Sequence, residues 1–167
     1  MKLYITSGTY PFMLLLKKKQ KKHSLILLQN ESDTLLLHET EGKTVFQTPR
    51  SYEVLTGFGD IEQKGYCVMH HIPVDAEDID VFEFKLKNYP LKKEYFHGLS
   101  AFRTLRPIKG NTYIVLSVWD SSNAFTLSEK QYTYPDTLIQ EFKNQWISIH
   151  SPTYVTKYVI PKEEDLE

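Results

Sequence analysis

LSAFRTLRPIKGNTYIVLSVW, residues 99–119, predicts a β-hairpin. Its two arms, Leu99–Ile108 and Thr112–Trp119, are rich in the apolar and β-branched residues that favour strands. The link, Lys109-Gly-Asn111, is short and contains a glycine, as tight connections between antiparallel strands do. The rest of the chain can be placed around these two strands.

Both faces of the second arm carry apolar residues. Successive side chains of a strand point to opposite sides of the sheet. One side would carry Tyr113, Val115, Ser117 and Trp119, and the other Ile114, Leu116 and Val118. This strand is therefore predicted to be covered on both sides, with Trp119 in the core.

A strand and a helix are predicted upstream of the hairpin. Tyr66–Val74 is a mostly apolar run that ends at Asp75. Beyond it, apolar residues recur at the spacing that lines one helical face. They are Ile79, Phe82, Leu86 and Tyr89. Asp75 is a candidate N-cap, and Asp78 stands three residues later, as in a capping box.

Two helices and a strand are predicted downstream. The first helix begins at Asp120 or Ser121, either of which can cap it, and runs through Lys130. The second helix spans Asp136–Gln145. Tyr154–Ile160 is rich in β-branched residues and is predicted as the last strand.

The N-terminal part follows a similar order. Lys2–Thr6 is predicted as a strand, and Phe12–Lys22 as a helix whose positive end offsets the helix dipole. Leu25–Gln29 and Thr34–Glu39 then flank the turn-forming residues Asn30–Asp33, which favours a second hairpin.

The order strand, helix, strand, strand therefore occurs twice. Thr44–Gln47 and Tyr52–Leu55 are predicted as further strands of the first half. We expect an N-terminal half at 1–62, a C-terminal domain at 65–161 and an acidic tail at 162–167. Neither half would bury much surface alone, so an α+β arrangement of helices on antiparallel sheet with one shared core is expected.

Composition is that of an ordinary globular protein. The 167 residues are 41% hydrophobic and 25% charged, with a net charge of −1. Such a balance gives no general reason to expect nucleic-acid binding. Cys67 is the only cysteine, which excludes a disulfide within the chain and favours a reducing compartment.

One basic cluster bears on location. The apolar run Phe12–Leu16 is too short to cross a bilayer, and the basic residues follow it, the reverse of a secretory signal. A cytoplasmic protein is therefore expected. Lys17–Lys22, with five lysines, could contact an anionic membrane surface; the alternative is a solvated helix end.

The common catalytic motifs are absent from the sequence, which leaves scattered polar residues to consider. His70 and His71 are adjacent in a predicted strand, so their rings should point to opposite faces and cannot enter one site. Two interpretations are open. One histidine has a structural, hydrogen-bonded role, or one of them binds a ligand or shuttles a proton. Trp146 would either pack or line a pocket.

Arg103 and Arg106 are a further pair of candidates. They are expected on a single face of their strand, where they could bind carboxylates through two hydrogen bonds each. The alternative is that they lie at the surface or brace a loop.

Several motifs resemble the antibiotic-biosynthesis-monooxygenase (ABM) family, especially its two-part members, which include haem-degrading monooxygenases and signal-transduction proteins. They are Tyr4–Tyr10, His38–Val45, Ser51–Val54, Leu99–Pro107, Gly110–Tyr113, Trp119-Asp120 and Tyr154–Pro161. The resemblance implies a ferredoxin-like ABM fold of the dimeric α+β barrel type. The N-terminal half would act as a second, degenerate ferredoxin-like unit, so that a monomer would suffice.

For the haem-degrading branch the resemblance also implies a cleft with an iron-binding histidine, a strand asparagine and a tryptophan against the porphyrin. These positions are occupied here by Leu138, His70 and Ser128 respectively. Leucine cannot bind iron and serine cannot press on a ring, which argues against the family's oxidation mechanism. His70 remains able to bind haem iron, with Trp146 as a second haem contact.

Three functions follow from the resemblance. The chain would be a ligand-binding or stress-signalling protein, with haem as a candidate ligand and no other cofactor. Alternatively, it would be a haem-degrading monooxygenase that uses another residue set, such as His70 and Trp146 with Tyr132 or Tyr134. Third, the cleft would hold nothing and the protein would act through protein contacts.

Overall fold

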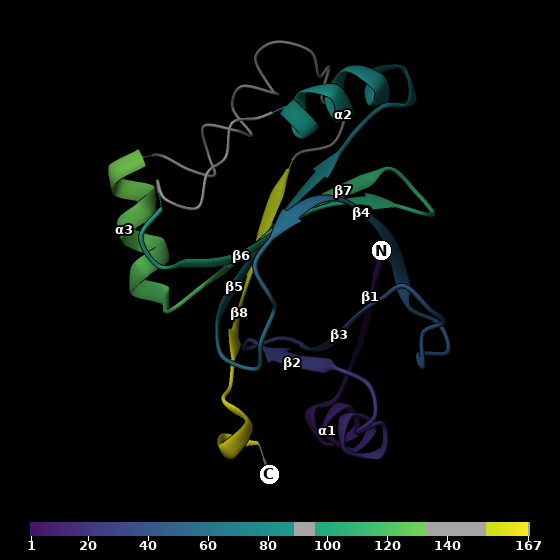
Figure 1. Ribbon diagram of the computed structural model, residues 1–167, viewed down its shortest axis with the longest axis vertical. Helices are drawn as coiled ribbons and strands as arrows, with labels where there is room; N and C mark the ends of the chain where they lie inside the picture. The colour runs from purple at the N-terminus through teal and green to yellow at the C-terminus, as the bar shows by residue number, and fades with distance from the viewer. Residues whose placement is uncertain (89–95, 133–152, 167) are drawn as a thin grey trace.

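The computed structural model describes residues 1–88, 96–132 and 153–166, in which eight strands form a closed antiparallel barrel (Figure 1). The strands are β1 (Lys2–Gly8), β2 (Leu25–Gln29), β3 (Thr34–Thr40), β4 (Arg50–Phe58), β5 (Gly65–Pro73), β6 (Leu99–Pro107), β7 (Thr112–Trp119) and β8 (Tyr154–Ile160). Their order around the barrel is β1-β3-β2-β8-β5-β7-β6-β4, and pairing of β4 with β1 closes it.

The two halves of the chain have the same strand order. Numbered within its own half, each set of four strands is arranged 4-1-3-2, as β4-β1-β3-β2 and as β8-β5-β7-β6. The first strand of each half therefore lies in the middle of its set, with the helix that follows it leading to an edge.

The barrel interior is filled by one apolar cluster to which every strand contributes. Its members include Leu3, Ile5, Leu28, Leu37, Cys67, Met69, Leu105, Leu116 and Ile160, each at most 2% exposed. Because side chains alternate along a strand, the other residues of each strand point outward.

Three α-helices lie outside the barrel within the described ranges: α1 (Tyr10–Lys19), α2 (Ile79–Asn88) and α3 (Ser122–Tyr132). Met13 and Leu14 of α1 pack on the outward side chains of β2 and β3. Phe82 of α2 and Phe125 of α3 belong to a second outer cluster with Trp119. Figure 1 shows α1 at the lower end of the view, away from α2 and α3. The described residues also contain two 3-10 turns, η1 (Ala76–Asp78) and η3 (Glu163–Asp165).

Gln63 joins the two strands that are held least by backbone pairing. The β2–β8 ladder contains one residue pair, Gln29 with Val159. The Gln63 amide accepts a hydrogen bond from the Leu27 N–H at 2.8 Å and donates to the carbonyls of Leu27 and Pro161 at 2.7 and 2.8 Å. A side-chain amide therefore replaces the missing ladder bonds.

Most of the predicted strands are confirmed. Leu25–Gln29, Thr112–Trp119 and Tyr154–Ile160 have the expected bounds. Trp119 is fully buried, as expected of a strand covered on both sides. Ser121 caps α3, since its Oγ accepts a hydrogen bond from the Ala124 N–H at 3.1 Å.

Two local predictions were wrong. Thr44–Gln47 is not a strand; the Thr44 hydroxyl bonds to His38 Nδ1 and to the Phe46 N–H, and Phe46 packs beside α1. The first helix ends at Lys19 rather than Lys22. Asp75 is at the predicted N-cap position, here of η1 ahead of α2, although its side chain makes no capping hydrogen bond.

Other predictions fall outside the described residues. They are the helix Asp136–Gln145 and the contribution of Tyr89 to the helical face before the hairpin. In the part of the chain that the structure describes, we find no helix with the length and hydrophobicity that crossing a bilayer requires.

Candidate functional site

His70 and His71 lie on opposite faces of β5, as predicted. His71 follows Cys67 and Met69, which belong to the interior cluster, at the spacing of one strand face. His70 shares the outer face with Val68 and belongs to the side of the sheet that carries α2 and α3. The His71 side chain therefore lies on the interior face of the barrel, and the His70 side chain lies on its outer face.

The His70 ring is buried with an unused nitrogen. The residue is 2% exposed, and its Nδ1 has no hydrogen-bond partner among the described residues. Burial first, and then the neighbouring charges of His71 and Lys157, lower the pKa of His70 to about 4. The imidazole is therefore neutral at pH 7, and a neutral imidazole can bind a metal ion.

Ser128 lies on α3, in the position that the resemblance gives to a porphyrin-contacting tryptophan. It is 4% exposed, and its hydroxyl donates to the Phe125 carbonyl of its own helix at 2.8 Å. The hydrogen-bonding need of the Ser128 hydroxyl is thus met within α3. Phe125 in turn lies under the Lys157 ammonium, 5.2 Å from its ring centre.

The other predicted site residues are not placed. Leu138, Trp146 and Tyr134 lie outside the described residues, and Tyr132 ends α3 without a described side chain.

His71 takes part in an aromatic stack at one end of the barrel. Its ring lies parallel to that of Tyr154, with centroids 4.3 Å apart and an interplanar angle of 7°. Its Nε2 is 2.9 Å from the Thr156 hydroxyl. Burial, followed by the charge of Arg50, lowers the pKa of His71 to about 4.

This end of the barrel contains a cavity of about 690 Å³. Its lining includes Arg50, Tyr52, His71, Lys109 and Tyr154. Sequence reasoning did not identify the cavity, because its residues come from four separate segments. The one available signal was the basic and aromatic character of the residues beside the strand ends.

Arg103 and Arg106 point to opposite faces, so the expectation of a single face was wrong. They are three residues apart in a strand, and an odd separation places side chains on different sides. The prediction that each arginine could bind a carboxylate through two hydrogen bonds is confirmed for Arg103 and for Arg106. Arg106 binds Glu83 of α2 through Nε at 2.8 Å and through a terminal nitrogen.

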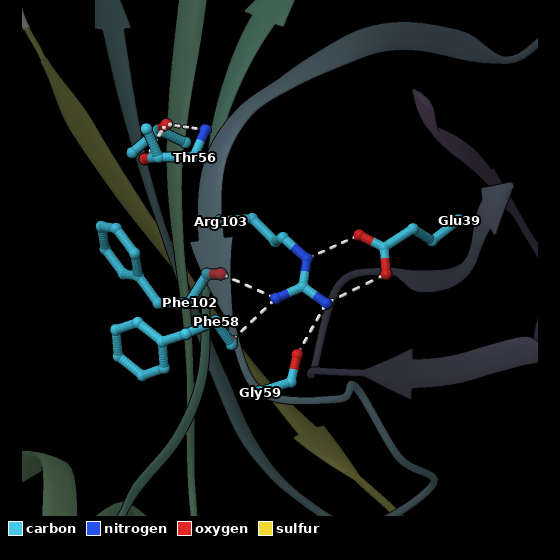
Figure 2. A network of polar contacts seen from close by, with 7 residues as sticks. Glu39, Thr56, Phe58, Gly59, Phe102 and Arg103 are labelled. Atoms are coloured by element: carbon cyan, nitrogen blue, oxygen red, sulfur yellow. Dashed lines mark hydrogen bonds and ion pairs between the residues drawn. The ribbon is translucent and has the colours of Figure 1, made fainter. Parts of the chain in front are cut away.

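Arg103 is the centre of the network in Figure 2. Its Nε and one terminal nitrogen donate to the two carboxylate oxygens of Glu39 at 2.6 and 3.0 Å. The remaining N–H groups donate to the carbonyls of Phe58, Gly59 and Phe102, each at 2.8 Å. All five donors are used, so this arginine braces the barrel and is not free to bind a ligand.

Position 59 in this network accepts only glycine. Its φ of +73° is a left-handed conformation, and a Cβ there would lie 2.1 Å from the Ser100 carbonyl oxygen. The close approach of β4 to β6 at this point brings the Gly59 carbonyl to Arg103 (Figure 2).

Glu83, Arg106 and Tyr113 hold α2 on the sheet. The Tyr113 hydroxyl donates to the same carboxylate that Arg106 binds. The hydrogen bond from Arg106 is the main cause that lowers the pKa of Glu83, while burial followed by the Glu83 carboxylate raises the pKa of Tyr113. This cluster is satisfied and structural.

The fold places the chain in a structural class, the α+β barrels similar to ferredoxin-fold proteins related to antibiotic biosynthesis monooxygenases. One such protein of Listeria monocytogenes 4b F2365 superimposes with a TM-score of 0.78 and 25% identity, over 96% of this chain and 94% of that one. LmHde, a heme-degrading enzyme of Listeria monocytogenes, gives a TM-score of 0.75 and 24% identity, over 96% and 100%.

Within this class, the chain is similar along its whole length to proteins named signal transduction protein TRAP. The protein of Staphylococcus epidermidis RP62A is 24% identical over 167 residues, covering 98% of this chain and 99% of the relative. That of Staphylococcus aureus USA300 is 26% identical over 165 residues, with the same coverage.

A solved structure described as a major regulator of staphylococcal pathogenesis has a TM-score of 0.83 at 24% identity, over 96% of this chain and 99% of that one. No family model matches the sequence. The resemblance read from the sequence is confirmed by these relatives and structural neighbours.

Proposed function

We propose that this protein is a ligand-binding signalling protein on an ABM-type scaffold, that haem is its ligand, and that it does not degrade haem. The observation that carries the proposal is the buried, unpartnered Nδ1 of His70. Buried polar atoms are nearly always hydrogen-bonded, so a buried nitrogen without a hydrogen-bond partner is a candidate atom for binding a ligand.

The chemistry of the donor set fits haem binding better than haem oxidation. His70 offers iron a neutral nitrogen from the sheet side. Ser128 and Leu138 stand where the resemblance gives a porphyrin-contacting tryptophan and an iron-binding histidine, and neither can take that role. Bound haem would supply a redox-active iron, which His70 would hold through Nδ1.

Haem titration tests this proposal. Adding hemin to the purified protein should shift the Soret band, and His70→Ala should abolish the shift. His97→Ala is the matched control, because His97 is exposed and lies in the same half of the chain. Because His70 is 2% exposed, we also expect hemin binding to require local opening of the protein around this residue. The association rate should therefore lie below the diffusion limit. A Soret shift that survives in His70→Ala would contradict the proposal.

A haem-degrading activity is the second candidate, supported by the structural similarity to LmHde. It would use His70 and Trp146 with Tyr132 or Tyr134. Incubating the hemin-loaded protein with ascorbate under air separates the two candidates. Steady loss of the Soret band with release of iron supports the enzyme. If hemin does not bind at micromolar concentration, a role through protein contacts alone replaces both.

We also propose that residues 1–62 are a degenerate counterpart of the ferredoxin-like domain at 65–161, so that the protein is a monomer. The shared 4-1-3-2 strand order supports this, as does closure of the barrel within one chain. Sedimentation equilibrium should give a mass near 19.6 kDa. A mass of twice that value would refute the monomer.

Peripheral membrane contact through Lys17–Lys22 is a further proposal. Lys17 is engaged, since its ammonium donates to the Leu25 carbonyl at 2.8 Å and pairs with Glu163 at 3.4 Å. The other four lysines are exposed, and so are Phe12 and Leu15 on the same helix. Co-sedimentation with anionic vesicles at low salt tests the contact, and absence of binding would discard it.

A further inference from the structure

The cavity at the barrel end is built from fixed segments. The Ile108 N–H donates to the Ser51 carbonyl, and the Val74 N–H donates to the Asn111 carbonyl, both at 2.9 Å. These bonds hold two of the lining loops, 47–52 and 107–112, in place. The cavity of about 690 Å³ lies within the range of small-molecule sites in proteins, roughly 300–1,000 Å³.

The charge of the lining is positive. Arg50 and Lys109 contribute cations, and the described lining contains neither Asp nor Glu. Among the described residues, Arg50 makes no ion pair, in contrast to Arg103 and Arg106. An arginine beside a cavity can bind a carboxylate or sulfonate through two parallel hydrogen bonds.

One wall of the cavity is aromatic. The Tyr154 ring is stacked on His71 and the residue is 51% exposed, so it offers flat apolar surface that a ligand can cover. Tyr52 adds a second ring to the lining. Planar ligands pack favourably against such rings.

Polar groups and open space complete the site. Ser51, Asn111 and Thr112 line the cavity with hydroxyl and amide groups. Gly110, with φ of +86°, has no atom within 4 Å of the position a Cβ would take, so the hairpin tip leaves room beside the cavity.

We propose that this barrel-end cavity binds a small planar organic anion, with its acidic group on Arg50 and its ring against Tyr154. The site is separate from His70, which faces the other side of β5 and does not line the cavity. It therefore does not rest on the haem proposal, and either can fail alone.

Calorimetry with 2-naphthoate tests the site in the full-length protein. Binding should occur at millimolar ligand or below. The neutral isostere 2-naphthalenemethanol and the ringless anion acetate should each bind at least about tenfold more weakly, since one loses the charge-assisted hydrogen bonds and the other the stacking. Absence of 2-naphthoate binding at millimolar concentration would overturn the proposal.

Four variants locate the binding. Arg50→Gln and Tyr154→Leu should each weaken 2-naphthoate by about tenfold. Both residues are exposed, so these variants should keep the wild-type melting temperature. Lys22→Gln removes an exposed charge outside the cavity and should leave affinity unchanged, as should His97→Gln, which changes an exposed residue that does not line the cavity. Equal affinity in Arg50→Gln, or a matching loss in Lys22→Gln or His97→Gln, would refute the site.

Discussion

Arg103 has all five of its N–H groups bonded inside the protein, to Glu39 and to three carbonyl oxygens (Figure 2). Lysine keeps the charge but has neither the planar fork nor the same number of donors. Arg103→Lys should therefore lower the free energy of unfolding by about 2 kcal/mol, measured by urea denaturation.

Arg106→Lys is the matched control for this prediction. Arg106 lies in the same strand and also binds a carboxylate, but its side chain is 40% exposed. Water can replace some of its hydrogen bonds, so the cost should be smaller, about 1 kcal/mol or less. If Arg103→Lys costs no more than Arg106→Lys, Arg103 does not brace the barrel.

The buried histidines predict a loss of stability in mild acid. The pKa values of His70 and His71 are lowered from 6.5 to about 4 in the folded protein. Between pH 6.5 and 4 the unfolded chain binds more protons, so stability falls as pH falls through this window and levels off below it. The loss is of the order of 3 kcal/mol per histidine at most.

Urea denaturation from pH 7 to pH 5 measures this effect above the range in which Glu83 titrates. His70→Gln should reduce the slope of stability against pH, and the exposed His97→Gln should not. An unchanged slope in His70→Gln would show that burial does not hold the His70 ring neutral.

Sequence pattern identified some of these residues and not others. The opposite faces of His70 and His71 follow from strand alternation, and the structure confirms them. The same rule, applied correctly, also separates Arg103 from Arg106. Gln63 had no sequence signal, because the backbone groups it binds lie far away in the sequence. Arg50 had only its basic character beside a strand end, because the other residues that line the cavity come from distant segments.

At the scale of elements, the Gln63 bridge predicts a weak point between β2 and β8. Gln63→Leu removes three hydrogen bonds and should destabilise the protein by about 2 kcal/mol. It should also speed hydrogen exchange of the Leu27 amide, which donates to the Gln63 side chain.

Gln63→Glu is the informative companion variant. It keeps an acceptor for the Leu27 N–H and loses the two bonds that the amide nitrogen donates. Leu27 exchange should then stay slower than in Gln63→Leu. If the Leu27 amide exchanged at the wild-type rate in both variants, the Gln63 hydrogen bonds would contribute nothing to the contact between β2 and β8.

Strands were easier to predict than the segments between them. Runs of apolar and β-branched residues bounded by turn residues predicted the observed ends of β2, β7 and β8. Thr44–Gln47 was predicted wrongly because Val45 and Phe46 look like a strand, although they pack beside α1 as a loop. The first helix stops at Lys19, three residues before the basic run ends.

At the scale of the whole molecule, pattern alone predicts helices on antiparallel sheet and a shared core. The barrel closes where the two halves meet, β2 with β8 and β4 with β6, contacts that no local pattern encodes. The resemblance to ABM proteins supplied that expectation. The matching strand order of the two halves supports the proposal that residues 1–62 are a degenerate counterpart of residues 65–161.

We propose that the ABM-type scaffold of this protein binds haem through His70 and does not oxidise it. The most direct measurement is the absorption spectrum of hemin-loaded protein followed over time with ascorbate under air. We expect a shifted Soret band that stays constant in the wild type and is absent in His70→Ala. A band that decays with release of iron, or one that forms equally in His70→Ala, would contradict it.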